Sequence, residues 1–175
     1  TGEDTLSLHD ALPISELTEN TVTGGVAMIN HALARRWHST DQIIMHDWYL
    51  ALLATATGAL IYIDQPGELY RQHENNVLGA RTLRKRLQKW LNPMQAIGKY
   101  WDLILNSQNQ ARLLLNQPDL SGDKRELIEK YEGLLNQTFS NRIKTIKKYH
   151  FKKNRTFHTV VFRTLIVTKM GYRKK

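Results

Sequence analysis

Residues 43–58, "IIMHDWYLALLATATG", constrain the fold more than any other stretch of this chain. Apolar side chains recur there at i, i+3, i+4, i+7, i+8 and i+11, the spacing of one buried helix face: Met45, Trp48, Tyr49, Leu52, Leu53 and Ala56. Gly58 follows the last of them, where a left-handed C-terminal cap is expected. We therefore predict a helix over residues 45–57 that packs against a core.

Asp47 lies in the first turn of this predicted helix, and its carboxylate has two interpretations. In the first, Asp47 only stabilises the helix start, where the helix dipole favours an acid by roughly 0.3–1 kcal/mol. In the second, the carboxylate is a catalytic base that accepts a proton. Both interpretations are compatible with this stretch.

The composition of the 175 residues excludes several classes of protein. A hydrophobic content of 41% and four Trp indicate a folded chain rather than a disordered one. The absence of Cys excludes disulfides and thiolate metal sites. No run of 18 apolar residues occurs, so we expect no membrane-spanning helix. The first residues lack a basic stretch followed by an apolar one, so we expect no signal peptide.

The net charge of +9 belongs to one end of the chain. Residues 133–175 hold 12 Lys/Arg and no acid, whereas the other residues hold 13 Lys/Arg against 16 Asp/Glu. This segment fits three roles: contact with an anionic membrane surface, a solvated face, or a nucleic-acid contact. No nucleic-acid fold signature occurs, so the third is the least favoured. The apolar run 157–170 is too short to span a bilayer, but it fits an interfacial helix.

Residues 4–14, "DTLSLHDALPI", match the translation of a common DNA sequencing adapter without a mismatch. We therefore expect residues 1–15 to be a non-native, adapter-like segment that packs poorly. Its Ser, His and Asp side chains receive no catalytic role.

The rest of the chain divides at about residue 80. Residues 16–80 alternate short extended stretches with predicted helices, one beginning near His31, and contain β-rich runs over 59–66 and 67–76. Residues 81–175 read as helical. One apolar stripe there is Met94, Ile97, Trp101, Ile104 and Leu105; a second, after Asp123 and Glu126 in capping-box spacing, is Leu127, Ile128, Tyr131, Leu134 and Leu135.

Three stretches together carry a family resemblance: "VTGGVAMINHAL" (22–33), "MHDWYLALLATATGALIYIDQP" (45–66) and "LYRQHENNVLGA" (69–80). They resemble the C-terminal half of family 2 glycosyltransferases, especially the rhamnosyltransferase-like members that build bacterial surface polysaccharides. The resemblance implies an α/β fold. We expect residues 16–80 to be the C-terminal half of a GT-A domain, a truncated mixed sheet with helices. Residues 81–175 would be a helical, basic C-terminal extension.

The resemblance also implies an activity. Such enzymes move a sugar, here suggested to be rhamnose, from a nucleotide-sugar donor to a saccharide or lipid-linked acceptor, with inversion and with a divalent metal, Mg or Mn. Inversion needs one carboxylate base for the acceptor hydroxyl, and Asp47 matches the family's base, with His46 before it. The expected location is cytoplasmic, peripheral on the inner face of the plasma membrane.

Two groups of residues match the family's contacts to the donor and acceptor sugars. Gly24 and Gly25 match a segment beside the sugars, where missing Cβ atoms let the backbone approach closely; a plain turn is the alternative. Trp48, next to His46 and Asp47, would stack on an acceptor ring, although its place on the apolar stripe favours core packing.

The remaining candidate residues follow the β-rich runs. Arg71, Gln72 and Asn76 match positions near the donor diphosphate, with a solvent-facing strand or a turn as the alternative. His73 matches a position that presents a metal ligand, although a single His without a second ligand is weak support for a metal site.

The chain departs from the family in one important respect. It contains no Asp-x-Asp metal motif and no nucleotide-binding strands, so we expect it not to bind donor well by itself. The alternative is a non-enzymatic, basic helical module that binds an anionic membrane or nucleic acid. Residues 69–76 argue against that module, because a helical module has no use for "YRQHENN" after two β-rich runs.

Overall fold

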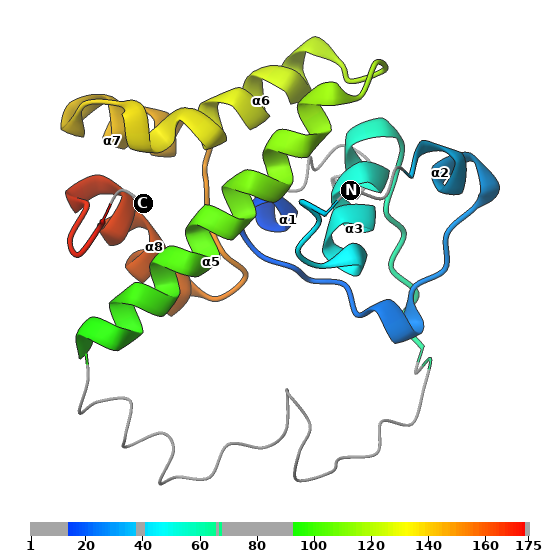
Figure 1. The fold of residues 1–175 in the computed structure, drawn as a ribbon, viewed down its shortest axis with the longest axis horizontal. Coiled ribbons are helices and arrows are strands. Elements are labelled where there is room, and N and C mark those ends of the chain that lie inside the picture. Colours follow the sequence, from blue (N-terminus) through cyan, green and yellow to red (C-terminus); the bar gives the residue numbers. More distant parts are fainter. Residues whose placement is uncertain (1–13, 38–40, 66, 68–92, 174–175) are drawn as a thin grey trace, which may run out of the picture.

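The computed structural model describes residues 14–37, 41–65, 67 and 93–173 (Figure 1). All regular structure in these residues is helical. The α-helices are α1 (Ile14–Thr18), α2 (His31–Arg36), α3 (His46–Thr57), α5 (Pro93–Leu113), α6 (Gly122–Glu132), α7 (Phe139–Lys148) and α8 (Thr156–Thr168). Short 3-10 turns are η1 (Gly24–Val26), η2 (Leu114–Asn116) and η3 (Gly133–Asn136).

The predicted α/β fold is wrong for the described residues, because they contain no strand and no sheet. Residues 59–65 of the first β-rich run have no regular structure, and successive side chains there are exposed, including Ile61 (73%) and Tyr62 (78%). A β-prone sequence becomes a strand only when a neighbouring strand pairs with it and covers one face. The described residues offer this segment no such neighbour, so the truncated mixed sheet is not formed.

The predicted helix around Asp47 is confirmed as α3. Five residues of its apolar stripe are buried, whereas Met45 is the N-cap residue and 43% exposed. The expected left-handed cap at Gly58 is wrong, since its φ is −164°, yet its N–H still donates to the Ala54 carbonyl (2.8 Å). The helix predicted near His31 is confirmed as α2, with the Asn30 side chain accepting from the Leu33 N–H (2.9 Å).

The two predicted helical stripes beyond residue 80 also form. On α5, Trp101 and Ile104 are buried, while Met94 is 65% exposed. All five residues of the second stripe, which runs through α6 into η3, are buried. The capping box at Asp123 is wrong, because Ser121 occupies the N-cap position and makes no capping side-chain bond.

Helix α5 is the centre of the molecule (Figure 1). It packs against α1, α6 and α8, while α3 contacts α1, α2 and η2. One hydrophobic cluster runs through these helices, from Leu17 in α1 and Leu52 in α3 to Phe162 and Ile166 in α8. Side chains from both predicted segments, 16–80 and 81–175, therefore share one core. Residues 1–13 of the adapter-like segment lie outside the described residues.

Part of the basic segment 133–175 is buried in this core. The Arg142 side chain is 6% exposed, and its guanidinium donates to the Val167 carbonyl (2.8 Å) near the end of α8 and to the Gln137 carbonyl (2.7 Å). The negative end of a helix dipole favours a cation at that position. Arg142 therefore joins α7 to α8.

Across the described residues, no helix combines the length and apolar character needed to cross a membrane.

Candidate functional site at the start of helix α3

The Asp47 carboxylate lies in the first turn of α3 and is partly buried. Its Oδ1 accepts a hydrogen bond from the Trp48 backbone N–H (2.7 Å). The backbone thereby fixes one carboxylate oxygen, and Oδ2 is the oxygen nearer the neighbouring turn η1. A carboxylate held in this way is positioned to accept a proton with its second oxygen.

The turn η1 lies directly against this carboxylate. A Cβ atom at Gly24 would lie 3.2 Å from His46 Nε2, 3.4 Å from Asp47 Cβ and 3.8 Å from Asp47 Oδ2. A Cβ atom at residue 24 would be tight against the His46 ring, so the absence of a side chain eases this close approach. The fold thus brings together Gly24, His46 and Asp47, three of the residues that the sequence analysis selected.

The chain returns to the same turn at Gly67. A Cβ atom there would lie 3.1 Å from Cγ1 of Val26, within η1. Gly25 lies between Gly24 and Val26 in η1 and is exposed. The start of α3, η1 and Gly67 therefore form one contiguous region.

A buried glutamine that the sequence analysis missed holds the start of α3. Gln110 of α5 is 0% exposed. Its Oε1 accepts from the Ile44 N–H (3.2 Å), and its Nε2 donates to the Met45 carbonyl (3.2 Å). Because both groups precede the first turn, Gln110 positions the backbone that carries His46 and Asp47. Gln110 sits in the polar run "NSQNQ" and carries no signal in the sequence.

Trp48 lies in the core. Its side chain is 4% exposed, and its Nε1 donates to the Glu16 carbonyl (2.6 Å). Trp48 therefore packs in the core, as its place on the apolar stripe favoured. No face of its ring is exposed for stacking on a sugar.

Glu16 itself is a buried acid beside this tryptophan. Its side chain accepts hydrogen bonds from the Thr21 hydroxyl and, at 3.4 Å, from the Thr21 N–H. Burial raises the pKa of Glu16 from 4.5 to about 7, and the negative charge of Glu19 adds to this, while the Thr21 N–H opposes it. The folded protein therefore binds this proton more tightly than the unfolded chain does.

We expect Glu16→Gln to remove a pH-dependent loss of stability. Between pH about 4.5 and about 7 the unfolded chain loses the Glu16 proton before the folded protein does, so the wild type becomes less stable as the pH rises. Glu16→Gln should match the wild type at pH 4 and exceed it at pH 8 by about 3 kcal/mol in unfolding free energy. Urea unfolding at the two pH values measures this difference.

The control for this experiment is Glu129→Gln, which removes an exposed acid of α6. It should change the unfolding free energy by about 0.5 kcal/mol or less at either pH. A Glu16→Gln variant less stable than the wild type at pH 8 would contradict the expected penalty for the buried carboxylate.

Four predicted site residues, Arg71, Gln72, His73 and Asn76, lie outside the described residues. Among the described residues, no three His, Cys, Asp or Glu side chains gather into a group that would hold a metal ion. The predicted metal ligand, His73, is one of the residues outside the described part of the chain. Within the described part, Asp47 is the acid that lies against the turn at Gly24.

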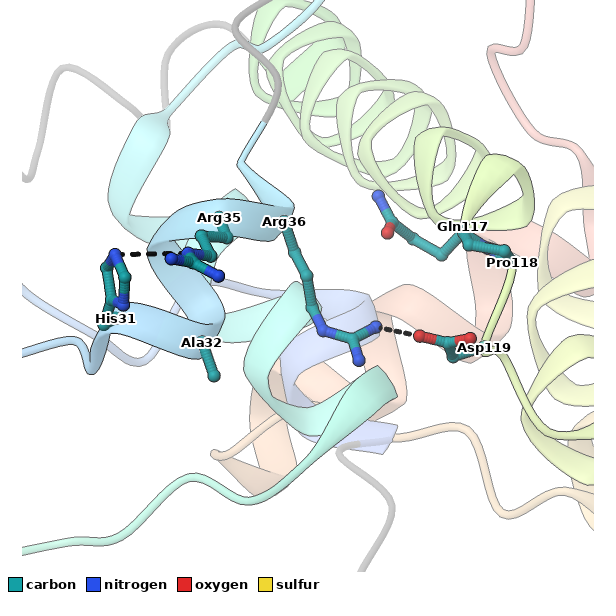
Figure 2. A pocket seen from close by; sticks show the side chains of 7 residues that line it. All are labelled: His31, Ala32, Arg35, Arg36, Gln117, Pro118 and Asp119. Atoms are coloured by element: carbon teal, nitrogen blue, oxygen red, sulfur yellow. Dashed lines mark hydrogen bonds and ion pairs between the residues drawn. The ribbon is translucent and has the colours of Figure 1, made fainter.

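A depression on the described surface lies elsewhere (Figure 2). It has a volume of about 470 Å³ and is lined by α2 and by residues 117–119. None of the predicted site residues lines it. The region around Asp47 and this depression are therefore two separate features.

No protein-family model, no curated protein and no solved structure matches this chain.

Proposed function

We propose that this chain is the acceptor-side part of an inverting glycosyltransferase and that Asp47 is its catalytic base. The observation that supports the proposal is the packing of Gly24 against His46 and Asp47. The family resemblance joins the same residues from two separate stretches of sequence. The proposal does not depend on the predicted sheet.

The proposed reaction is a single in-line displacement. The acceptor hydroxyl oxygen forms a bond to the anomeric carbon of the donor sugar while the bond from that carbon to the diphosphate oxygen breaks. The hydroxyl proton passes to Oδ2 of Asp47, and the nucleoside diphosphate leaves with the bonding electron pair. One displacement inverts the anomeric centre.

The close approach of Gly24 gives this chemistry a location. An acceptor sugar that lies over η1 would meet backbone rather than a side chain, and it would be within reach of both His46 and Asp47. Gln110 acts as a positioning residue, because it holds the backbone at Ile44 and Met45.

The other components of the proposed enzyme come from the resemblance. They are a nucleotide-sugar donor, with rhamnose as the suggested sugar, a divalent metal, and a saccharide or lipid-linked acceptor. Such an enzyme would work at the cytoplasmic, inner face of the plasma membrane. The missing Asp-x-Asp motif means that donor binding requires residues beyond this chain.

The test is a transfer assay with a labelled nucleotide-sugar. The 175-residue chain should give no transfer, whereas the same chain joined to a donor-binding half with an Asp-x-Asp motif should transfer. The Asp47→Asn variant of the joined enzyme then tests the base. Donor-dependent transfer by the 175-residue chain would contradict the proposed division of labour.

A second proposal, a contact with anionic membranes, is favoured by the surface of residues 133–175. Exposed cations of α7, including Lys144 and Lys147, lie in the same segment as exposed apolar side chains of α8, Phe157 (70%) and Val160 (59%). Charged and apolar groups together suit the interface of a bilayer with anionic lipids. This contact is compatible with a lipid-linked acceptor.

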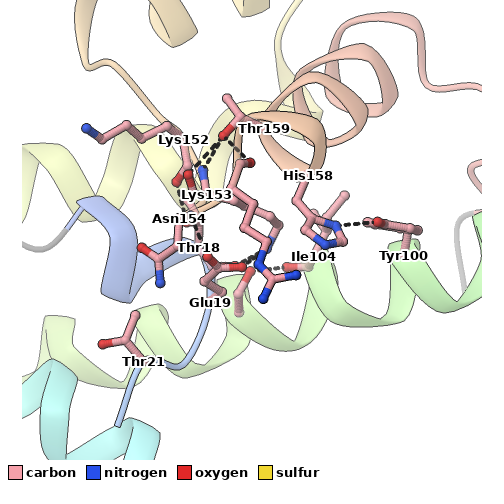
Figure 3. Close-up of polar contacts among 12 residues, drawn as sticks. Thr18, Glu19, Thr21, Tyr100, Ile104, Lys152, Lys153, Asn154, His158 and Thr159 are labelled. Atoms are coloured by element: carbon pink, nitrogen blue, oxygen red, sulfur yellow. Dashed lines mark hydrogen bonds and ion pairs between the residues drawn. The ribbon is translucent and has the colours of Figure 1, made fainter. Parts of the chain in front are cut away.

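The basic segment is tied to the beginning of the fold, so this proposal concerns the whole chain. Figure 3 shows Thr18 and Glu19 against residues 152–154. The Lys153 ammonium donates to the Thr18 carbonyl and lies 3.8 Å from a Glu19 carboxylate oxygen. The Asn154 N–H donates to the other Glu19 oxygen (2.5 Å).

We expect the whole chain to bind vesicles that contain phosphatidylserine and to leave them as salt rises. Screening acts over about 8 Å at physiological ionic strength, so exposed cations lose their attraction. The double variant Lys144→Gln and Lys147→Gln should bind about 10- to 30-fold more weakly, at about 1 kcal/mol for each lysine. Vesicle co-sedimentation measures this change.

The matched control is the double variant Lys99→Gln and Lys130→Gln. It removes the same charge from exposed positions on α5 and α6 and should bind like the wild type. Equal binding to neutral phosphatidylcholine vesicles would contradict an electrostatic contact. A preference for single-stranded nucleic acid would favour the alternative binding module.

A further inference from the structure

The depression beside α2 has walls from two separate parts of the chain (Figure 2). One wall is α2, and the other follows η2 at residues 117–119. An ion pair between Arg36 Nη1 and Asp119 Oδ2 (2.6 Å) joins the walls. Gln117, at 7% exposed, is anchored below by its contact with the Tyr49 hydroxyl (3.5 Å). These two contacts fix the walls of the depression relative to each other and to α3.

The α2 wall presents hydrogen-bond donors. Arg35 and His31 lie one helical turn apart, and Arg35 Nε donates to His31 Nε2 (3.2 Å). A ring nitrogen accepts only when it carries no proton, so this geometry assigns the His31 proton to Nδ1, which is a donor. The two terminal nitrogens of Arg35 are also donors, and no described carboxylate pairs with them.

The charges of the lining leave one cation in excess. Arg36 is paired with Asp119 at 2.6 Å, whereas Arg35 contacts the His31 ring and no described carboxylate. The planar fork of a guanidinium matches two oxygens of one phosphate or carboxylate group. The volume of about 470 Å³ lies in the range of small-molecule sites, so it has room for more than a single ion.

We propose that this depression binds the phosphoryl group of a phosphate ester or a diphosphate. The Arg35 guanidinium forms the paired hydrogen bonds to two phosphoryl oxygens, and His31 Nδ1–H is available to a further oxygen. The ion pair between Arg36 and Asp119 keeps the two walls of the depression together. This site shares no residue with the region around Asp47, so it stands or falls independently of the proposed glycosyl transfer.

The test is a titration of the ¹⁵N-labelled 175-residue chain with inorganic pyrophosphate and, separately, with glycerol 3-phosphate. Backbone shifts should change in α2 and at residues 117–119. Arg35→Ala should weaken binding about 10-fold or more, and Arg35→Lys should fall between, because lysine keeps the charge but loses the fork. Because Arg35 is exposed on α2, neither variant is expected to disturb the core.

Arg155→Ala is the matched control, since it removes one exposed arginine outside the depression. It should bind both probes within about twofold of the wild type. Tighter binding of pyrophosphate than of glycerol 3-phosphate would assign the site to diphosphates, and the reverse order would assign it to monoesters. Equal losses in Arg35→Ala and Arg155→Ala, or no shift changes in α2, would overturn the proposal.

Discussion

In an enzyme that joins this chain to a donor-binding half, Asp47→Asn should lower turnover by ~10²–10⁴, the usual contribution of a positioned general base. Asparagine is nearly the same size and keeps the oxygen that accepts from the Trp48 N–H, so the start of α3 is retained. The amide cannot take the acceptor proton. Donor affinity should change little, because the proposed role of the carboxylate is to take the proton of the acceptor hydroxyl. Steady-state rates with a labelled nucleotide-sugar, together with donor binding measured directly, check both expectations.

Asp123→Asn separates catalysis from helix stability. Asp123 is an exposed acid in the first turn of α6, as Asp47 is an acid in the first turn of α3. Both variants should lose roughly 0.3–1 kcal/mol of unfolding free energy through the helix dipole. Only Asp47→Asn should lose turnover. If Asp47→Asn melted at a lower temperature but kept wild-type turnover, Asp47 would be a helix-start residue and no base.

Phe162→Ala should cost about 3–5 kcal/mol of unfolding free energy, a large share of the total stability of a domain of this size. Phe162 of α8 is 0% exposed, and its ring centroid lies 6.5 Å from that of Tyr131, which is also fully buried. Truncation leaves a cavity between α6 and α8 that the surrounding helices fill only in part. Urea unfolding followed by circular dichroism measures the loss.

Phe157→Ala is the control on the same helix. Its ring is 70% exposed, so the variant should stay within about 0.5 kcal/mol of the wild type. A cost below about 1 kcal/mol for Phe162→Ala as well would show that α8 does not unfold cooperatively with the core. The pair thus tests whether residues 133–175 belong to the fold that contains α3.

The helices were predictable because their signal is local. In α3 the apolar residues repeat with the period of a helix, and an amphipathic helix needs only a core on one side. The same holds for Trp101 and Ile104 on α5 and for Leu127 and Tyr131 on α6, all of which are buried. The predicted helix caps at Gly58 and Asp123 were wrong, because a cap depends on the path that the chain takes beyond the helix.

The strands that the same kind of pattern predicted did not form in the described residues. Residues 59–65 have β-prone side chains, yet a strand also needs a hydrogen-bonding neighbour, and the described residues supply none. Ile61 and Tyr62 are therefore exposed in a segment without regular structure. The predicted α/β fold was therefore wrong because a local β preference does not by itself provide a strand to pair with.

The sequence by itself determined the helix that carries Asp47, the position of Asp47 in its first turn, and the concentration of positive charge in residues 133–175. Only the tertiary structure decided which distant groups meet there. It places Gly24 against His46 and Asp47, it buries Gln110 under the start of α3, and it turns part of the basic segment into core. The physical reason is that periodicity reports which face of a helix avoids water, whereas buried polar groups are stable only where distant backbone groups satisfy them.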